Sequence, residues 1–166
     1  MDEQSIIVAK NLPGVQPENY GGDYHNNLLA QYLKCIDMAD KISERRNTAN
    51  IFCLSLNTGL ISALGITNLF SNTMSDLILV VIAIAAVVFC ICWYCLIQSY
   101  SNLNTAKFKV IHELERFLPT RPYFAEWECV DRGKTGKLYI PLTHIERYVP
   151  FAFILLYVAL MITALV

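Results

Sequence analysis

Three cysteines lie close together in one apolar stretch, and by residue type and spacing they are the residues most suited to chemistry. Cys92 and Cys95 have the C-x-x-C spacing of redox and metal sites, and Cys90 precedes them. Apolar surroundings suppress formation of the reactive thiolate. No His lies nearby to complete a zinc site, which normally takes four ligands. The pattern therefore favours cysteines that pack as small, polarisable side chains.

The remaining titratable residues form no recognisable active site. His25, His112 and His144 are dispersed in the sequence, whereas Glu126 and Glu128 share one face of a segment with strand-like composition. Two such carboxylates resemble an acid–base pair, but nothing marks a substrate cleft around them, which favours a solvated strand face. No Gly-rich phosphate loop or Ser/His/Asp arrangement is present. We therefore expect no enzymatic activity, no catalytic residue, no metal site and no cofactor.

The uncharged segment 50–70 carries the residues most suited to association. It is long enough to cross a bilayer, yet it is rich in Ser, Thr, Asn and Gly. A buried polar group without a partner costs about 1–3 kcal/mol, so the segment should face protein or a wet cavity rather than lipid. Ser55, Gly59 and Ala63 have the small-xxx-small spacing that lets membrane helices approach closely. The predicted oligomer interface or pore lining comprises Ser55, Asn57, Thr58, Gly59, Ser62 and Ala63.

Asn57 is the most informative residue of this segment. It lies about 10 Å into the span by helical rise, where its amide requires a partner. In one interpretation it bonds the second membrane helix or a neighbouring subunit, which contributes about 0.6–2 kcal/mol. In the other it lines a pore together with Ser62 or Thr58. Packing is favoured, although a ring of Asn57 side chains could serve both roles.

The elements that position these residues follow from apolar periodicity and from the distribution of Gly and Pro. Residues 27–118 predict a long helical hairpin with membrane spans at about 50–70 and 77–98, because Gly and Pro are absent from 27–58 and 77–118. Outside the spans both helices should continue as an antiparallel cytoplasmic stalk. Residues 143–166 predict a third membrane helix, which begins with the capping box of Thr143 and Glu146.

Two segments are expected to be less regular. Residues 1–26 predict a polar, irregular or disordered N-terminal tail, in which Ile6–Val8 is a candidate for a short docked strand. Residues 119–142 predict a small β-hairpin-like element, with PYFAEWECV and KLYIPL as strands around the turn DRGKTG. The expected fold is a mainly α membrane protein with three transmembrane helices, a helical stalk and this β element.

The basic residues predict the orientation in the membrane. Every Lys and Arg precedes Asn50 or lies between Lys107 and Arg147. The positive-inside rule therefore places the N-terminus, the stalk and residues 119–142 in the cytoplasm and the C-terminus outward, in the inner membrane if the source is a bacterium. With a net charge of −1, no nucleic-acid partner is expected. The basic residues expected at the surface of the lipid bilayer are Arg45, Arg46, Lys107 and Lys109. Each would contribute about 1 kcal/mol of attraction to anionic lipid.

Several sequence blocks between residues 29 and 156 resemble the RipA family of octameric bacterial membrane proteins. The blocks are ADKISERR (39–46), SLNT (55–58), SYSNLNTAKFKVI (99–111), the Leu118–Pro119 step, YIPLT (139–143) and ERYVP (146–150). The resemblance implies a homo-oligomeric inner-membrane assembly, an octamer, with a cytoplasmic portion. It supplies no active-site residues, because the matching blocks contain no catalytic motif.

Two hypotheses of function follow. The first is a homo-oligomeric inner-membrane protein with a structural or interaction role and a cytoplasmic stalk. The alternative is a pore-forming or membrane-disrupting effector, for example in phage defence, gated by a cytoplasmic protein or a small-molecule trigger. A membrane enzyme or transporter is least favoured, because transport usually needs charge within the membrane and the three predicted spans contain none.

Overall fold

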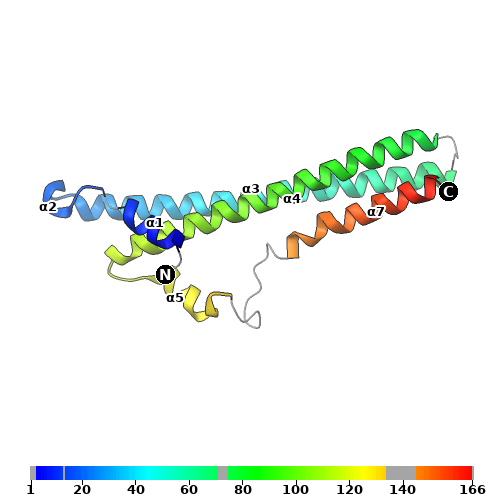
Figure 1. The fold of residues 1–166 in the computed structure, drawn as a ribbon. Coiled ribbons are helices and arrows are strands. Elements are labelled where there is room, and N and C mark those ends of the chain that lie inside the picture. The colour runs from blue at the N-terminus through cyan, green and yellow to red at the C-terminus, as the bar shows by residue number, and fades with distance from the viewer. Residues whose placement is uncertain (1–2, 13, 71–74, 134–144, 166) are drawn as a thin grey trace. The chain divides into compact units, whose positions relative to one another are not determined.

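The structure is a computed structural model that describes residues 3–12, 14–70, 75–133 and 145–165 (Figure 1). These residues contain helices and no strand. Three of the helices are long and apolar enough to cross a membrane. The elements are α1 (Glu3–Asn11), α2 (Pro17–Tyr20), α3 (Tyr24–Phe70), α4 (Asp76–Leu114), η1 (Glu115–Phe117), α5 (Pro122–Cys129), η2 (Asp131–Gly133) and α7 (Tyr148–Leu165).

Both ends of α4 follow from the local sequence. The carbonyl of Ser75 accepts hydrogen bonds from the amides of Ile78 at 2.9 Å and Leu79 at 3.2 Å, which opens α4. Asp76 then lies in the first turn, where a negative charge suits the helix dipole. At the other end η1 closes the helix, and Leu118 is extended because Pro119 follows it. Local sequence therefore explains both boundaries of α4.

The chain divides into two compact units, and α3 and α4 contribute to both. The first unit comprises Met1–Glu44 and Ser101–Ile140, and the second comprises Arg45–Tyr100 and Pro141–Val166. In the first unit the start of α3 packs against the end of α4, which makes their pairing antiparallel, as predicted. The buried residues of this core are Leu28, Tyr32, Ala39, Ile111 and Leu114.

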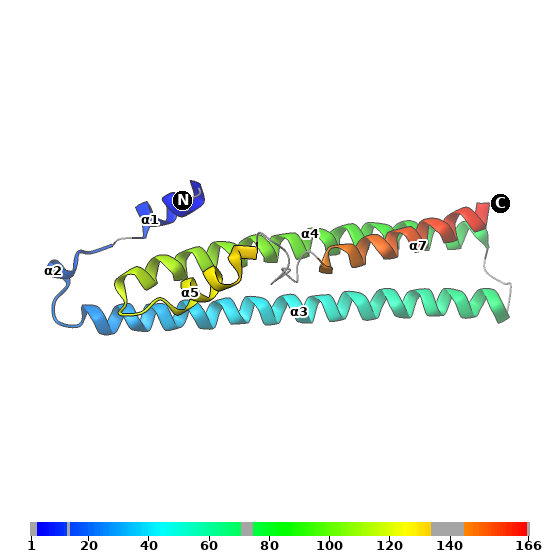
Figure 2. The same cartoon turned by 90° about the horizontal axis from the view of Figure 1, so that it is seen from below.

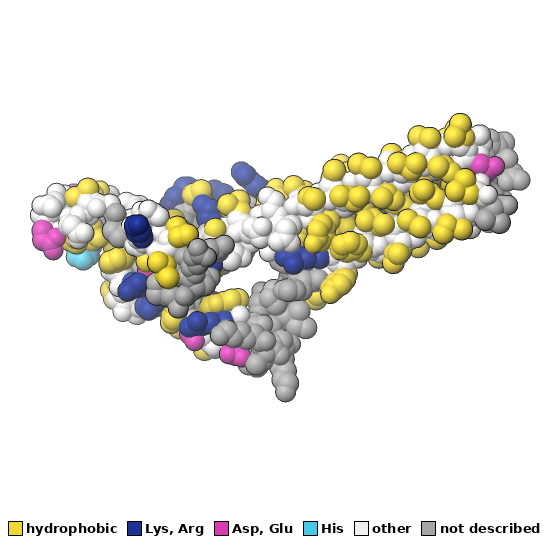
Figure 3. Space-filling view, viewed as in Figure 1, with side chains coloured by type: hydrophobic (Ala, Val, Ile, Leu, Met, Phe, Trp, Pro, Cys, Tyr) yellow, Lys and Arg dark blue, Asp and Glu magenta, His cyan; other side chains and the backbone are white. Residues whose placement is uncertain are grey.

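The second unit is a three-helix bundle of α3, α4 and α7. Its buried cores place Cys53 of α3 with Trp93 of α4, and Cys90 of α4 with Tyr157 of α7. In this unit α4 runs antiparallel to α3, whereas α7 runs parallel to α3 (Figure 2). On the face drawn in Figure 3, hydrophobic side chains predominate over the apolar parts of these helices. The three predicted membrane spans therefore pack together within one chain.

Two expectations about β structure are wrong in the described residues. Pro122–Cys129, expected as the first strand of a hairpin, is the helix α5. Proline at the first helical position is preorganised for a helix, and a buried carboxylate caps this helix, as described below. The expected second strand at 137–142 and the capping residue Thr143 lie outside the described residues. Ile6–Val8 is also helical, within α1, rather than a docked strand.

Candidate functional site

Asn57 is the centre of a buried polar cluster in the second unit. Its side chain is 1% exposed, and Cys90 and Tyr157 are fully buried. The Asn57 Nδ2 group donates to the carbonyl of Cys53 at 2.8 Å. Its Oδ1 atom accepts from the Tyr157 hydroxyl at 3.0 Å and from the Cys90 thiol at 3.3 Å. One amide therefore connects α3 to both α4 and α7.

Tyr157 was not singled out from the sequence, although one signal pointed to it. It is a tyrosine in the middle of an otherwise apolar span, and a buried tyrosine hydroxyl usually finds a hydrogen-bond partner. The sequence did not indicate the hydrogen-bond partner of this hydroxyl, Asn57, which lies 100 residues earlier. Cys90 has the packing role favoured for the cysteines, and it adds a weak hydrogen bond to Asn57.

A second polar contact joins α3 and α4 two helical turns from Asn57. The Trp93 indole donates to Asn50 Oδ1 at 2.9 Å, and Trp93 is 3% exposed. Its ring lies 6.2 Å from that of Phe153 in α7. Asn50 and Asn57 are separated by about 10 Å along the helix. The two asparagines therefore set the register of the bundle, since a one-residue slip would unpair both.

The other residues predicted at an interface or pore face away from this cluster. Ser55, Thr58, Gly59 and Ser62 are exposed and lie within an arc of about 100° on α3, opposite Asn57. Ala63 is also exposed, at the edge of this arc. A Cβ atom added at Gly59 would meet nothing within 4 Å. We call Ser55, Thr58, Gly59 and Ser62 the small-residue face of α3. Its role between subunits stays a prediction.

The cysteines do not form a reactive or metal-binding group. All six are free; Cys92 and Cys95 are exposed on α4, whereas Cys53 and Cys90 are buried. Over the described residues, no group of three or more His, Cys, Asp or Glu side chains is arranged to hold a metal ion. The C-x-x-C spacing therefore reflects two outward positions of a membrane helix.

Glu115 is the centre of the first unit, and sequence reasoning missed it. The residue is fully buried. Its Oε1 atom accepts from the Tyr32 hydroxyl at 3.0 Å and from the amide of Tyr123 at 2.9 Å, and Oε2 accepts from the amide of Phe124 at 3.0 Å. The two amides belong to the first turn of α5, so the carboxylate replaces an N-cap side chain, which Arg121 does not supply. Glu115 thereby connects α3, η1 and α5.

Burial and charge perturb two neighbours of Glu115. Burial and the hydrogen bond to Glu115 raise the pKa of Tyr32 to about 12. Burial lowers the pKa of His112, and the Arg121 charge acts in the same direction while Glu115 opposes it. The Arg121 guanidinium lies 4.1 Å from the centre of the Phe124 ring. Because all these groups pack against one another, the cluster anchors α5.

The remaining titratable candidates have separate surroundings. His25 contacts the ring of Tyr24, whereas His144 lies outside the described residues. Glu126 and Glu128 are exposed on α5 rather than on a strand. Glu128 pairs with Arg132. The described histidines, His25 and His112, therefore contact different aromatic rings, and the two carboxylates lie on the surface of α5.

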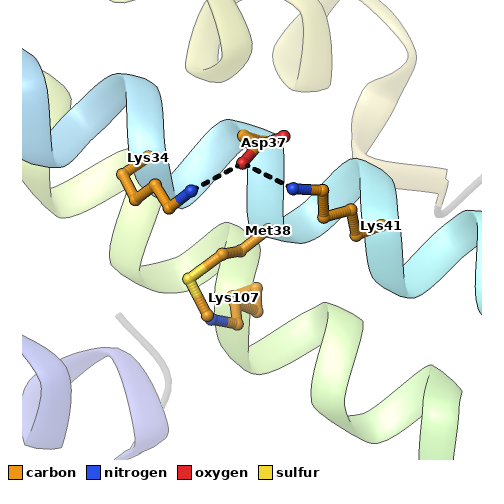
Figure 4. Close-up of polar contacts among 5 residues, drawn as sticks. All are labelled: Lys34, Asp37, Met38, Lys41 and Lys107. Carbon is orange, nitrogen blue, oxygen red and sulfur yellow. Dashed lines mark hydrogen bonds and ion pairs between the residues drawn. The ribbon is translucent and has the colours of Figure 1, made fainter.

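The four predicted surface basic residues belong to different units. Arg45 is exposed, and Arg46 Nε lies 3.6 Å from Glu146 Oε2, in the second unit. In the first unit Lys107 Nζ lies 3.8 Å from Met38 Sδ, and Lys109 is half-buried. Figure 4 shows the Met38 contact beside an exposed ion-pair group, in which Lys34 and Lys41 both bond Asp37 and lower the pKa of its carboxyl.

Comparison with known proteins gives one family. Residues 29–166 match the model described as "Octameric membrane protein family (8xMP)". The match does not confirm the name RipA. No curated protein and no solved structure matches the chain.

Proposed function

We propose that this chain, which belongs to the Octameric membrane protein family (8xMP), functions as a structural or interaction subunit of a homo-oligomer in a bacterial inner membrane. Family membership implies self-association in a membrane, in agreement with the three apolar helices. The proposal adds that the small-residue face of α3 contacts the neighbouring subunits.

The observation that carries this proposal is that Asn57 and the small-residue face lie on opposite sides of α3. Asn57 forms its hydrogen bonds within the chain. Gly59 is exposed, and among the described residues no atom lies within 4 Å of a Cβ atom placed on it. Helices associate in membranes through small residues, because lipid supplies no hydrophobic driving force between them. A glycine and three hydroxyl residues facing outward are therefore suited to close contact with another helix.

The proposed orientation rests on charge. No Lys or Arg lies between residues 47 and 106, and none follows Arg147. The positive-inside rule therefore supports a cytoplasmic first unit, a cytoplasmic N-terminus and an outward C-terminus. We propose no enzymatic activity, since the buried carboxylate of Glu115 already accepts three hydrogen bonds.

The test is to replace Gly59 with Leu and to measure the native mass in a mild detergent. We expect the variant to lose the octamer but keep its helical content, because Gly59 is exposed and no described residue lies within 4 Å of a Cβ atom at this position. Ala85→Leu is the control: it adds three carbon atoms at an exposed position of α4 and should leave the octamer intact. An intact Gly59→Leu octamer would exclude the small-residue face from the interface.

A second candidate function, a pore, is favoured by the hydroxyl groups of the same face. Ser55, Thr58 and Ser62 are exposed on one side of a membrane helix, and polar side chains of this kind line aqueous pores. A protein of this kind would depolarise cells when a cytoplasmic protein or small molecule triggers it. Expression in cells loaded with a potential-sensitive dye tests this. Depolarisation that Ser62→Leu abolishes without loss of the octamer would favour the pore over the structural role.

A further inference from the structure

The buried part of α5, in the first unit, is its first turn. Tyr123 and Phe124 are half-buried, whereas residues 125–129 are all exposed. A helix of eight residues is too short to be stable by itself in water. The folding of α5 therefore depends mainly on the contacts that Tyr123 and Phe124 make with other elements.

Three kinds of contact hold this first turn against α4 and η1. The Glu115 carboxylate accepts hydrogen bonds from the amides of Tyr123 at 2.9 Å and Phe124 at 3.0 Å. The Tyr123 ring centre lies 6.1 Å from that of Phe108. The Phe124 ring centre lies 5.8 Å from that of the His112 imidazole, in a T-shaped arrangement. A titratable imidazole therefore forms part of the contact between α4 and α5.

The Phe124 ring also contacts a permanent cation. The Arg121 guanidinium lies 4.1 Å from the centre of this ring, where the ring quadrupole attracts a positive charge. A proton on His112 would place a second positive charge beside the same ring. Like charges repel, and a half-buried site screens this repulsion less than bulk water does. Docking of Phe124 is therefore compatible with a neutral His112 and opposed by a charged one.

The other charged groups around His112 do not reverse this preference. Burial, the largest effect, lowers the pKa of His112, and the Arg121 charge acts in the same direction, while Glu115, Glu113 and a backbone hydrogen bond oppose them. From α3, Tyr32 faces the cluster as a neutral group, because its pKa is about 12. A histidine held neutral in the docked state contributes stability above its ordinary pKa of 6.5, and this contribution is lost as the pH falls below 6.5.

We propose that α5 is an acid-released latch, in which a proton on His112 undocks the first turn of α5 from α4 and unfolds this short helix. The pairing of α3 with α4 persists, because its buried core contains no histidine or carboxylate. The residues of this core are Leu28, Tyr32, Ala39, Ile111 and Leu114. The latch lies in the first unit and does not use the small-residue face of α3.

The test is hydrogen exchange of the full-length protein in a mild detergent from about pH 7.5 to about pH 5.5, corrected for the intrinsic exchange rate. Below pH 6.5, exchange at the amides of Tyr123 and Phe124 should accelerate by up to about tenfold per pH unit. The amide of Ile111, whose side chain is buried between α3 and α4, should stay protected. Absence of the acceleration, or an equal acceleration at Ile111, would overturn the latch.

Two variants of His112 identify the titrating group. His112→Phe keeps an aromatic ring beside Phe108 and Phe124, and His112→Gln keeps a hydrogen-bonding group. Neither side chain takes up a proton, so neither variant should show the acid acceleration. His25→Gln is the control, because His25 is exposed in the same unit, and it should keep the full acceleration. An acceleration that persists in a His112 variant protected at neutral pH would assign the effect to Glu115 and contradict the proposal.

Discussion

The hydrogen bond between Asn57 and Tyr157 should couple α3 energetically to α7. Tyr157→Phe removes the hydroxyl that donates to Asn57 Oδ1 at 3.0 Å. Asn57→Leu removes this acceptor, which the Cys90 thiol also uses, while it keeps the number and branching of the side-chain heavy atoms. Both changes are small in shape, so their effects report on the polar cluster rather than on a cavity.

The expected magnitudes follow from hydrogen bonds measured within membranes. Such bonds contribute about 0.6 kcal/mol on average and up to about 1.7 kcal/mol. Tyr157→Phe should therefore lower the free energy of unfolding by about 0.6–1.7 kcal/mol. Asn57→Leu should cost about 1–2 kcal/mol, because the Tyr157 hydroxyl keeps the backbone carbonyl of residue 57 as an acceptor at 3.4 Å. The double variant should lose less free energy of unfolding than the sum of the losses in the two single variants.

Unfolding by a denaturing detergent measures this double-mutant cycle. Trp93 is 3% exposed and reports on the bundle by its fluorescence, in a Trp127→Phe background that leaves it as the single tryptophan. Thr163→Val is the control partner, since its hydroxyl bonds the backbone of its own helix. The effect of Thr163→Val on the free energy of unfolding should simply add to that of Asn57→Leu.

Additive effects of Asn57→Leu and Tyr157→Phe would refute the reasoning. A different failure is also informative: Asn57→Leu with unchanged unfolding but a lost octamer would place its partner on a neighbouring subunit. We expect the octamer to persist, because the small-residue face of α3 is untouched.

Three further predictions concern the first unit. Glu115→Gln weakens charge-assisted bonds of about 1.5–3 kcal/mol, so hydrogen exchange at the amides of Tyr123 and Phe124 should accelerate about 10- to 150-fold; exposed Glu126→Gln, the control, should have no such effect. Because the pKa of Tyr32 is raised to about 12, its folded state holds a proton that the unfolded state releases near pH 10. The stabilisation that Tyr32 contributes is present below pH 10 and lost between pH 10 and 12, so the stability of Tyr32→Phe should fall less steeply over this range in an alkaline titration, and an equally steep fall would contradict the reasoning. The pKa of His112 is lowered from 6.5, so stability should fall as pH drops through 6.5; His112→Gln should flatten this dependence, and an unchanged slope would contradict it.

The sequence by itself determined the number and extent of the apolar helices. Charge-free runs and the absence of Gly and Pro are local properties, and they predict α4 and α7 without any knowledge of packing. The antiparallel pairing of α3 with α4 also followed, since only a short connection joins them. The same local reasoning gave the wrong answer for Pro122–Cys129, where aromatic residues favour a strand in isolation. A helix forms there, and Glu115 supplies its cap from an adjacent element.

Only the tertiary structure decided which polar residues face inward. Asn57 and Ser55 lie two residues apart in one predicted interface, but a helix turns by about 200° between them. The direction of each depends on where Tyr157 and Cys90 lie. Likewise, Glu115 resembles any surface carboxylate until Tyr32 and the amides of α5 surround it. Partners 83 and 100 residues away in the chain satisfy these buried groups, and no local pattern encodes contacts of that range.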